Sequence, residues 1–266
     1  MRVRPRPVVF RRPASWAGAG LVGLLVVAAT LAVRGADRMV LWRIVHEKCV
    51  PDQQANQNPA PCVLVDLSAG EDGGVAILKD INGIAQHLAI PTRRIAGIEA
   101  PDILDPALPN YWRAAWAARS SVNARLSHEL PRGAIGLAIN AASRRSQDQL
   151  HIHIDCVAPD VRDALAAYGD KLSVDWHVLP FALKGRRYWA RRLDSENLSD
   201  ASPFQLLAEG VEGAKAEMGL WTILAAGANF DGQPGFILLA DHAELAAGGH
   251  AEDLQDHDCA IVPPKP

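Results

Sequence analysis

The sequence lacks a strong net charge, because its 27 lysine and arginine residues are nearly balanced by 30 aspartate and glutamate residues. A formal net charge of -3 provides no overall basic field to attract nucleic acid, so we expect no nucleic-acid partner. Internal repeats and a clean linker are also absent from the sequence, which favours a single domain with a C-terminal elaboration. Composition excludes a disordered chain, since 49% of the 266 residues are hydrophobic and can bury a full core.

Long hydrophobic runs are scarce, and the exception is an uncharged segment from Ala14 to Val33. A helix needs about 20 apolar residues to cross a bilayer, and arginines on one flank favour a cytoplasmic location for that flank. We therefore predict a cytoplasmic basic N-terminus at residues 1–13, a transmembrane anchor at residues 14–34 and an exported domain at residues 35–266. A cleaved signal peptide is the alternative, and it would export the same domain. The flanking arginines are Arg2, Arg4, Arg6, Arg11 and Arg12.

Cysteine is scarce as well, and the four residues can form two disulfides in three different pairings. Disulfides persist in the oxidising compartment that an exported domain would occupy. Cys49 and Cys62 bracket the polar loop VPDQQANQNPAP, which a local disulfide could close with little strain. Cys156 is then left to pair with Cys259. We expect both bridges to serve stability.

The periodicity of the remaining chain predicts an α+β fold, with helices packed on an antiparallel sheet. Residues 36–48 have the spacing of a short amphipathic helix, and the run NYWRAAWAARSSVNARLS predicts a helix capped by Asn110. Further helices are expected at residues 160–168 and 202–218, with a turn region at residues 227–235. Strands are expected at residues 75–79, 86–91, 134–140, 149–156 and 236–240.

The stretch QDQLHIHIDC places His151 and His153 two residues apart within one predicted strand. Side chains alternate across a strand, so both histidines share a face with Gln149 and Asp155, opposite the aliphatic residues. Three interpretations compete: a solvated polar face, a metal site, or a nucleophilic imidazole that attacks phosphorus. The metal interpretation lacks support because the sequence contains no His-Glu-x-x-His motif. The loop just upstream offers phosphate-binding side chains, namely Asn140, Arg144, Arg145, Ser146 and Gln147.

The run AIN, followed by a polar loop and then LHIHI, resembles the histidine triad superfamily of nucleotidyl hydrolases and transferases. Longer stretches resemble the CDP-diacylglycerol pyrophosphatase family, the membrane-anchored branch of that superfamily. They cover most of the chain after residue 34 and are CVPDQQANQNPAPC, KDINGIAQHLAIPT, HIHIDCVAPDVRDAL, RRYWARRL, SPFQLLAE and LQDHDC.

This resemblance implies a histidine triad-like sheet that hydrolyses CDP-diacylglycerol to CMP and phosphatidate through a nucleotidyl-histidine. The superfamily pattern His-φ-His-φ-His makes His151 the nucleophile and His153 the third position, with Gln149 in place of the first histidine. Glutamine can still donate and accept hydrogen bonds there. Asn140 and Ser146 match positions that orient phosphate and assist the leaving group, and Asp80 falls near the position that holds the ribose hydroxyls. Arg145 of the upstream loop is a further candidate for binding the substrate phosphate.

The resemblance also implies a location and a set of partners. It predicts a single-pass protein of the bacterial inner membrane, with the catalytic domain on the periplasmic side and CDP-diacylglycerol as its membrane partner. No cofactor and no metal are expected, and a homodimer is an alternative to a monomer because relatives often dimerise. Two alternatives stay open: a hydrolase or nucleotidyltransferase for soluble nucleotide diphosphates, and a non-catalytic anchored module that binds a nucleotide or a metal.

Overall fold

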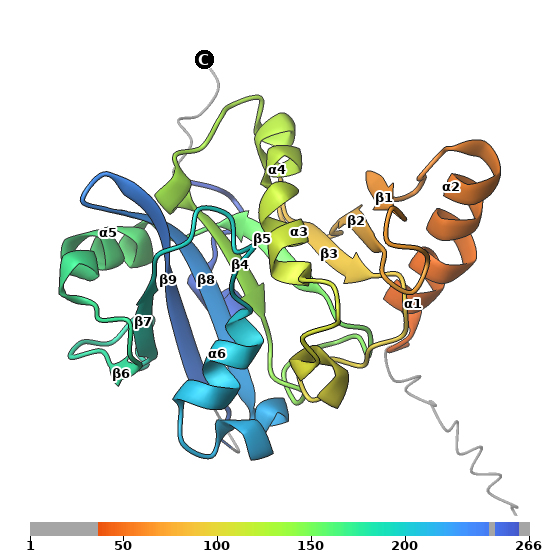
Figure 1. The fold of residues 1–266 in the computed structure, drawn as a ribbon. Helices are drawn as coiled ribbons and strands as arrows, with labels where there is room; N and C mark the ends of the chain where they lie inside the picture. Colours follow the sequence, from red (N-terminus) through yellow and green to blue (C-terminus); the bar gives the residue numbers. More distant parts are fainter. Residues whose placement is uncertain (1–36, 245–247, 261–266) are drawn as a thin grey trace, which may run out of the picture. The chain divides into compact units, whose positions relative to one another are not determined.

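One antiparallel sheet forms the centre of the protein. The computed structural model describes residues 37–244 and 248–260, which all lie in one compact unit that begins at Ala36. Within these residues nine strands follow the spatial order β1-β2-β3-β5-β4-β8-β9-β7-β6 (Figure 1). The strands are β1 (Leu64–Asp66), β2 (Val75–Lys79), β3 (His87–Pro91), β4 (Ile135–Ile139), β5 (Ile152–Cys156), β6 (His177–Val178), β7 (Trp189–Leu193), β8 (Trp221–Phe230) and β9 (Gln233–His242).

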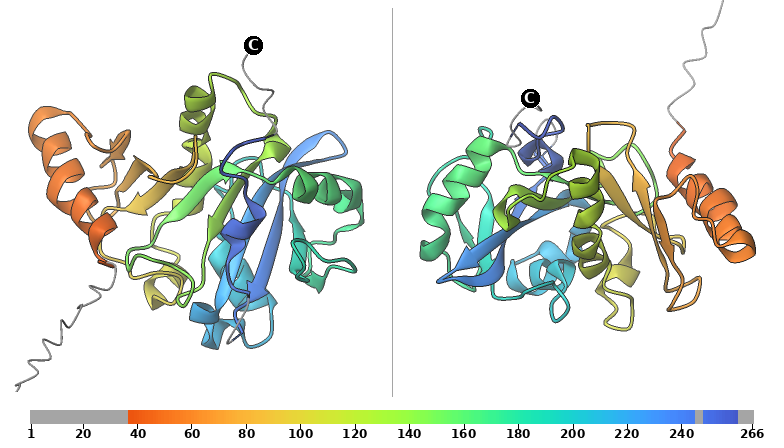
Figure 2. Two further views of the ribbon diagram at one scale, coloured as in Figure 1. Left: turned by 180° about the vertical axis from the view of Figure 1, so that it is seen from behind. Right: turned by 90° about the horizontal axis from the view of Figure 1, so that it is seen from above.

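Helices cover both faces of this antiparallel sheet (Figure 2). They are α1 (Val40–Ile44), α2 (Val50–Asn56), α3 (Tyr111–Ala117), α4 (Arg119–Leu126), α5 (Pro159–Tyr168) and α6 (Pro203–Gly210), and the π-helical turn Val45–Cys49 joins α1 to α2. Residues from α3, α4 and α6 form one core cluster with the sheet. Separate clusters pack α1–α2 and α5 against other sheet residues. The predicted α+β class is confirmed.

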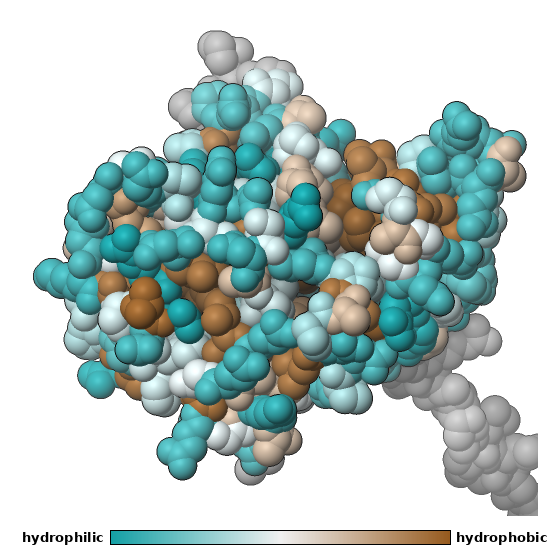
Figure 3. All heavy atoms as spheres, viewed as in Figure 1, coloured by the Kyte–Doolittle hydropathy of each residue, from teal (hydrophilic) through white to brown (hydrophobic). Residues whose placement is uncertain are grey.

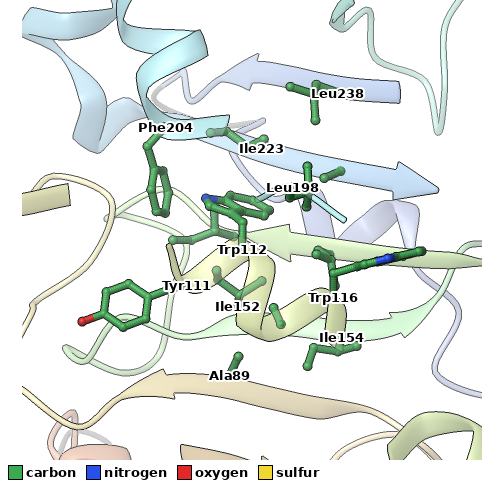
Figure 4. Packing of buried hydrophobic residues seen from close by; sticks show 14 of the residues in the cluster. Ala89, Tyr111, Trp112, Trp116, Ile152, Ile154, Leu198, Phe204, Ile223 and Leu238 are labelled. Atoms are coloured by element: carbon green, nitrogen blue, oxygen red, sulfur yellow. The ribbon is translucent and has the colours of Figure 1, made fainter. Parts of the chain in front are cut away.

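The large core lies beneath α3, where two tryptophans meet the sheet (Figure 4). Trp112 and Trp116 are 1% and 2% exposed, and they pack edge-on against Phe204 and Phe236. The predicted helix at residues 110–127 is divided into α3 and α4 at Ala118. Its predicted cap is confirmed, because the Asn110 side chain accepts a hydrogen bond from the backbone N–H of Arg113.

The C-terminal half differs most from the sequence prediction. The helix expected at residues 202–218 ends at Gly210, and β8 occupies part of the expected turn region, so that the chain reverses only at Asp231 and Gly232. Gly227 lies inside β8, and its position requires a glycine because a Cβ there would clash with the carbonyl oxygen of Arg132. A glycine that indicates a turn in the sequence therefore serves close packing within a strand.

Both predicted disulfides are present. Cys49 is bonded to Cys62, and Cys156 is bonded to Cys259 across a separation of 103 residues. The segment between the first pair is not wholly a loop, because Val50–Asn56 forms α2 and continues the helical run that starts at Val40.

The predicted anchor, residues 14–34, lies outside the described residues. Within the part of the chain that the structure describes, no helix combines the length and apolar character needed to cross a bilayer. Figure 3 shows apolar surface between α4 and β1, where Leu64 is 48% exposed. Leu64 also lines a cavity of about 430 Å³, together with Ile77 and small residues of α3 and α4.

Candidate active site

The histidine face of β5 is buried, which rules out the interpretation of a solvated polar face. His151 and His153 are 6% and 5% exposed, and Asp155 is 0% exposed. The cover comes from residues 248–260, here called the C-terminal segment, which run along β4 and β5 (Figure 2). Gln255 fastens this segment to both strands, because its Nε2 donates to the carbonyl oxygens of Gly136 at 2.8 Å and His153 at 3.2 Å.

A cavity of about 200 Å³ opens onto this face. Asp80, Ser146, His151, His153 and Glu252 form its polar side. Its apolar side is built from α1 and the strands below it, through Val40, Leu41, Ile44, Leu78 and Leu88, and Ile81 stands next to Asp80. The cavity thus brings together five of the side chains named from the sequence, because Gln147 also lines it.

His151 is held in one tautomer. It immediately precedes β5, and its Nδ1 lies 2.6 Å from the carbonyl oxygen of Gln149, so Nδ1 carries the proton and donates it. The Nε2 lone pair is therefore the one left for chemistry. Burial lowers the pKa of His151, although the backbone contact and the Glu252 carboxylate act in the opposite direction. The imidazole is neutral at neutral pH, as a nucleophile must be.

His153 forms a pair with Glu252, a residue that the sequence analysis missed. The His153 Nδ1 lies 3.2 Å from Glu252 Oε1, and the two histidine rings meet edge-on with centroids 4.9 Å apart. The amide nitrogen of Gln86 also lies 3.2 Å from His153 Nδ1, and Nε2 is buried without a hydrogen-bond partner among the described residues. Burial lowers the pKa of His153 despite the nearby carboxylate, which raises it.

Glu252 is the centre of a wider network. Its oxygens accept hydrogen bonds from the amides of Gln86 and Asn140, each at 3.0 Å. On its outer side His257 Nε2 lies 3.5 Å away, and His257 Nδ1 contacts Asp155 at 2.8 Å. The contact with Asp155 raises the pKa of His257. A chain of polar contacts therefore runs from Asp155 through His257 and Glu252 to His153.

The other predicted site residues divide into two groups. Asn140 reaches the cavity through Glu252, and Ser146 and Asp80 line the cavity directly. Arg145 and Gln149 lie beside His151 around a space too small to hold a water molecule, and both side chains are already engaged. Arg145 forms ion pairs with Glu99 at 2.5 Å and Asp148 at 3.1 Å.

Gln149 is bonded to the backbone and not directed at the cavity. Its Nε2 donates to the carbonyl oxygens of Pro91 at 3.0 Å and Arg93 at 2.9 Å, and the residue is 0% exposed. It ties the start of β5 to the end of β3, and its own carbonyl orients His151.

The Cys156–Cys259 disulfide fixes the C-terminal segment, so removing it should affect both stability and turnover. A closure of about 100 residues contributes about 4 to 5 kcal/mol to the free energy of unfolding, and a closure of about 15 residues about 3 kcal/mol. We expect a Cys156→Ala, Cys259→Ala protein to lose the larger amount and most of its kcat, because Glu252 loses its support.

The Cys49→Ala, Cys62→Ala protein is the matched control, and it should lose the smaller amount of stability with a much smaller fall in kcat. Denaturant unfolding and steady-state kinetics on both proteins measure the two effects. Equal falls in kcat would show that the second bridge has no special connection with the site.

The sheet and the cavity define a class of protein: an antiparallel α+β domain with a buried, neutral histidine beside a histidine–carboxylate pair. Residues 36–263 match the family described as CDP-diacylglycerol pyrophosphatase, and the chain belongs to this family. A protein of Yersinia pestis named CDP-diacylglycerol pyrophosphatase is 40% identical over 250 residues, which cover 92% of this chain and 94% of that relative. The family resemblance read from the sequence is confirmed.

Proposed function

We propose that the protein hydrolyses the phosphoanhydride bond of CDP-diacylglycerol, giving CMP and phosphatidate. Family membership supports the substrate and the reaction. The observation that carries the chemistry is the Nδ1 contact of His151 with the Gln149 carbonyl, because it leaves Nε2 as the unprotonated nitrogen of a residue that lines the cavity. We further propose that the sheet is of the histidine triad type.

In the first step, His151 Nε2 attacks the phosphorus of the CMP half of the substrate. A nitrogen–phosphorus bond forms, the anhydride bond to the bridging oxygen breaks, and phosphatidate leaves with that bond's electron pair. Ser146 lies in the cavity, where its hydroxyl can donate to a phosphate oxygen. Asp80 can accept hydrogen bonds from the ribose hydroxyls.

In the second step, water attacks the nucleotidyl-histidine and releases CMP. The neutral His153 accepts the proton of this water on Nε2, and the Glu252 carboxylate stabilises the imidazolium that forms. Asn140 and Gln86 hold that carboxylate through their amide donors. Gln149 orients His151 through its backbone carbonyl oxygen, and Arg145, which lies beside both residues, is held by Glu99 and Asp148.

The proposed location is the periplasmic side of the bacterial inner membrane, with residues 14–34 as the single anchor. The two disulfides support an oxidising compartment. CDP-diacylglycerol is itself a membrane lipid, so an anchor would keep enzyme and substrate on the same surface.

Trapping a covalent intermediate tests this function. Protein mixed briefly with CDP-diacylglycerol and denatured at alkaline pH, where phosphoramidates survive, should carry a CMP adduct that peptide mass spectrometry maps to His151. An adduct at another residue would overturn the assignment of the nucleophile. CMP release by the wild-type protein with no adduct under any quench would favour direct attack by water.

The geometry of the described residues does not support the alternative interpretation, a metal-binding site. Among the described residues, the close cluster of potential ligands is Asp155, Cys156 and Cys259, and its two sulfurs are joined in a disulfide. A metal-dependent reaction would be revealed by loss of CMP release in EDTA and its recovery with zinc.

A further inference from the structure

The loop between β2 and β3 presents an isoleucine to solvent at the edge of the active-site cavity. Ile81 is 98% exposed and yet lines the same cavity as His151. Ile84, in the same loop, is 50% exposed, and Val40 of α1 is 38% exposed on the cavity's apolar side. Single exposed apolar residues are common in proteins, so exposure alone does not assign a role.

The loop is fixed in this shape by a lysine. The Lys79 ammonium donates to three carbonyl oxygens of the loop, those of Asp80 at 2.6 Å, Asn82 at 3.2 Å and Gly83 at 2.9 Å. The backbone N–H of Ile84 donates to the carbonyl oxygen of His257 at 2.9 Å, which attaches the loop to the C-terminal segment. The hydrogen bonds of the Lys79 ammonium therefore hold the loop in the shape that exposes Ile81.

The cavity also has two sides of different polarity. One side carries Asp80, Ser146 and the histidines, and the other carries Leu41, Ile44 and Val40 of α1. Figure 2 shows α1 alongside the β2–β3 hairpin, and Leu41 and Ile44 pack on Leu78 and Leu88 of that hairpin. A nucleotide diphosphate suits the polar side, and acyl chains suit the apolar side.

We propose that Ile81, together with Ile84 and Val40, forms an apolar lip that enters the bilayer surface and contacts the acyl chains of the lipid substrate. The inference rests on the proposed function, because it assigns the lipid half of that substrate to one edge of the cavity. The lip lowers KM for the lipid and leaves the reacting phosphorus to the polar side.

Steady-state kinetics with the lipid substrate in vesicles test whether the apolar lip contacts the acyl chains. Ile81→Ser should raise KM for CDP-diacylglycerol in phosphatidylcholine vesicles about tenfold and leave kcat unchanged, since part of an isoleucine's burial energy is lost. Val174→Ser is the matched control, because Val174 is also exposed, at 53%, but does not line the cavity. An unchanged KM in Ile81→Ser, or the same rise in both variants, would overturn the proposal.

A second measurement is independent of turnover. All four cysteines of the chain are in disulfides, so Ile81→Cys and Val174→Cys each provide a single thiol for a polarity-sensitive dye. In the full-length protein reconstituted into phosphatidylcholine vesicles, the dye at residue 81 should report an apolar environment, and the dye at residue 174 an aqueous one. An aqueous signal at both sites would contradict the membrane-contacting lip, even if CMP is released. An apolar signal at residue 81 without CMP release would contradict only the proposed function.

Discussion

Replacing His151 with asparagine should lower kcat for CMP release from CDP-diacylglycerol by at least about 10³-fold, the scale of losing a covalent nucleophile. The amide of the introduced asparagine would still donate to the Gln149 carbonyl that His151 Nδ1 contacts at 2.6 Å. It has no nitrogen lone pair to attack phosphorus, so the intermediate cannot form. Initial rates and the absence of the CMP adduct measure the effect together.

His87 offers a matched control for this substitution. It is also a buried strand histidine, 3% exposed, and its Nδ1 lies 2.7 Å from the carbonyl oxygen of Ala85. Its ladder partner on β5 is Ile154, which places it on the sheet face opposite His153. His87→Asn should lower the melting temperature without removing the adduct. A His151→Asn protein that keeps its melting temperature and its full rate would end the nucleophile assignment.

The strand pattern predicted the composition of the histidine face, but not what covers it. Alternation places His151 and His153 opposite Ile152 and Ile154, and the core cluster confirms that the isoleucines face α3. Burial of the histidines depends on Glu252 and Gln255, which lie about a hundred residues downstream and pack there through long-range contacts. Local periodicity contains no information about such a partner.

Gln149 shows where an extrapolated alternation fails. The ladder of β5 begins at Ile152, and Gln149 lies three residues before it, so the strand alternation that still places His151 no longer holds at Gln149. The Gln149 side chain instead bonds the backbone at Pro91 and Arg93. The motif position therefore identified a neighbour of His151, and the contacts that the Gln149 amide makes in this structure are with backbone groups.

Glu252 could have been suspected from a weaker signal. It stands two residues before the stretch LQDHDC, which contributed to the family resemblance, in a short turn of 3-10 helix from Ala251 to Leu254. Such a turn has no periodicity that would reveal which side chain points inward. Only the assembled sheet shows that this carboxylate, and not Asp253 next to it, faces His153.

Converting Glu252 to glutamine should lower kcat about 10²-fold and make the second step limiting, so that the CMP adduct on His151 accumulates. The carboxylate now 3.2 Å from His153 Nδ1 would be gone, and the imidazolium that forms when water loses its proton would have no counter-charge. Glutamine keeps the size of the side chain. The adduct distinguishes this role from a structural one, because a misfolded site would form no intermediate.

The pH dependence of kcat/KM tests whether Glu252 raises the pKa of the cavity histidines. Burial lowers the pKa of both cavity histidines, while Glu252 raises it, so the acid limb of kcat/KM in the wild-type protein should lie below the ordinary value of 6.5. Without the carboxylate the limb should move to still lower pH. Glu217→Gln is the control, because Glu217 contacts the half-buried His242 at 3.4 Å outside the cavity. An acid limb that moves upward in Glu252→Gln, or a burst of CMP with no adduct, would show that Glu252 does not act through His153.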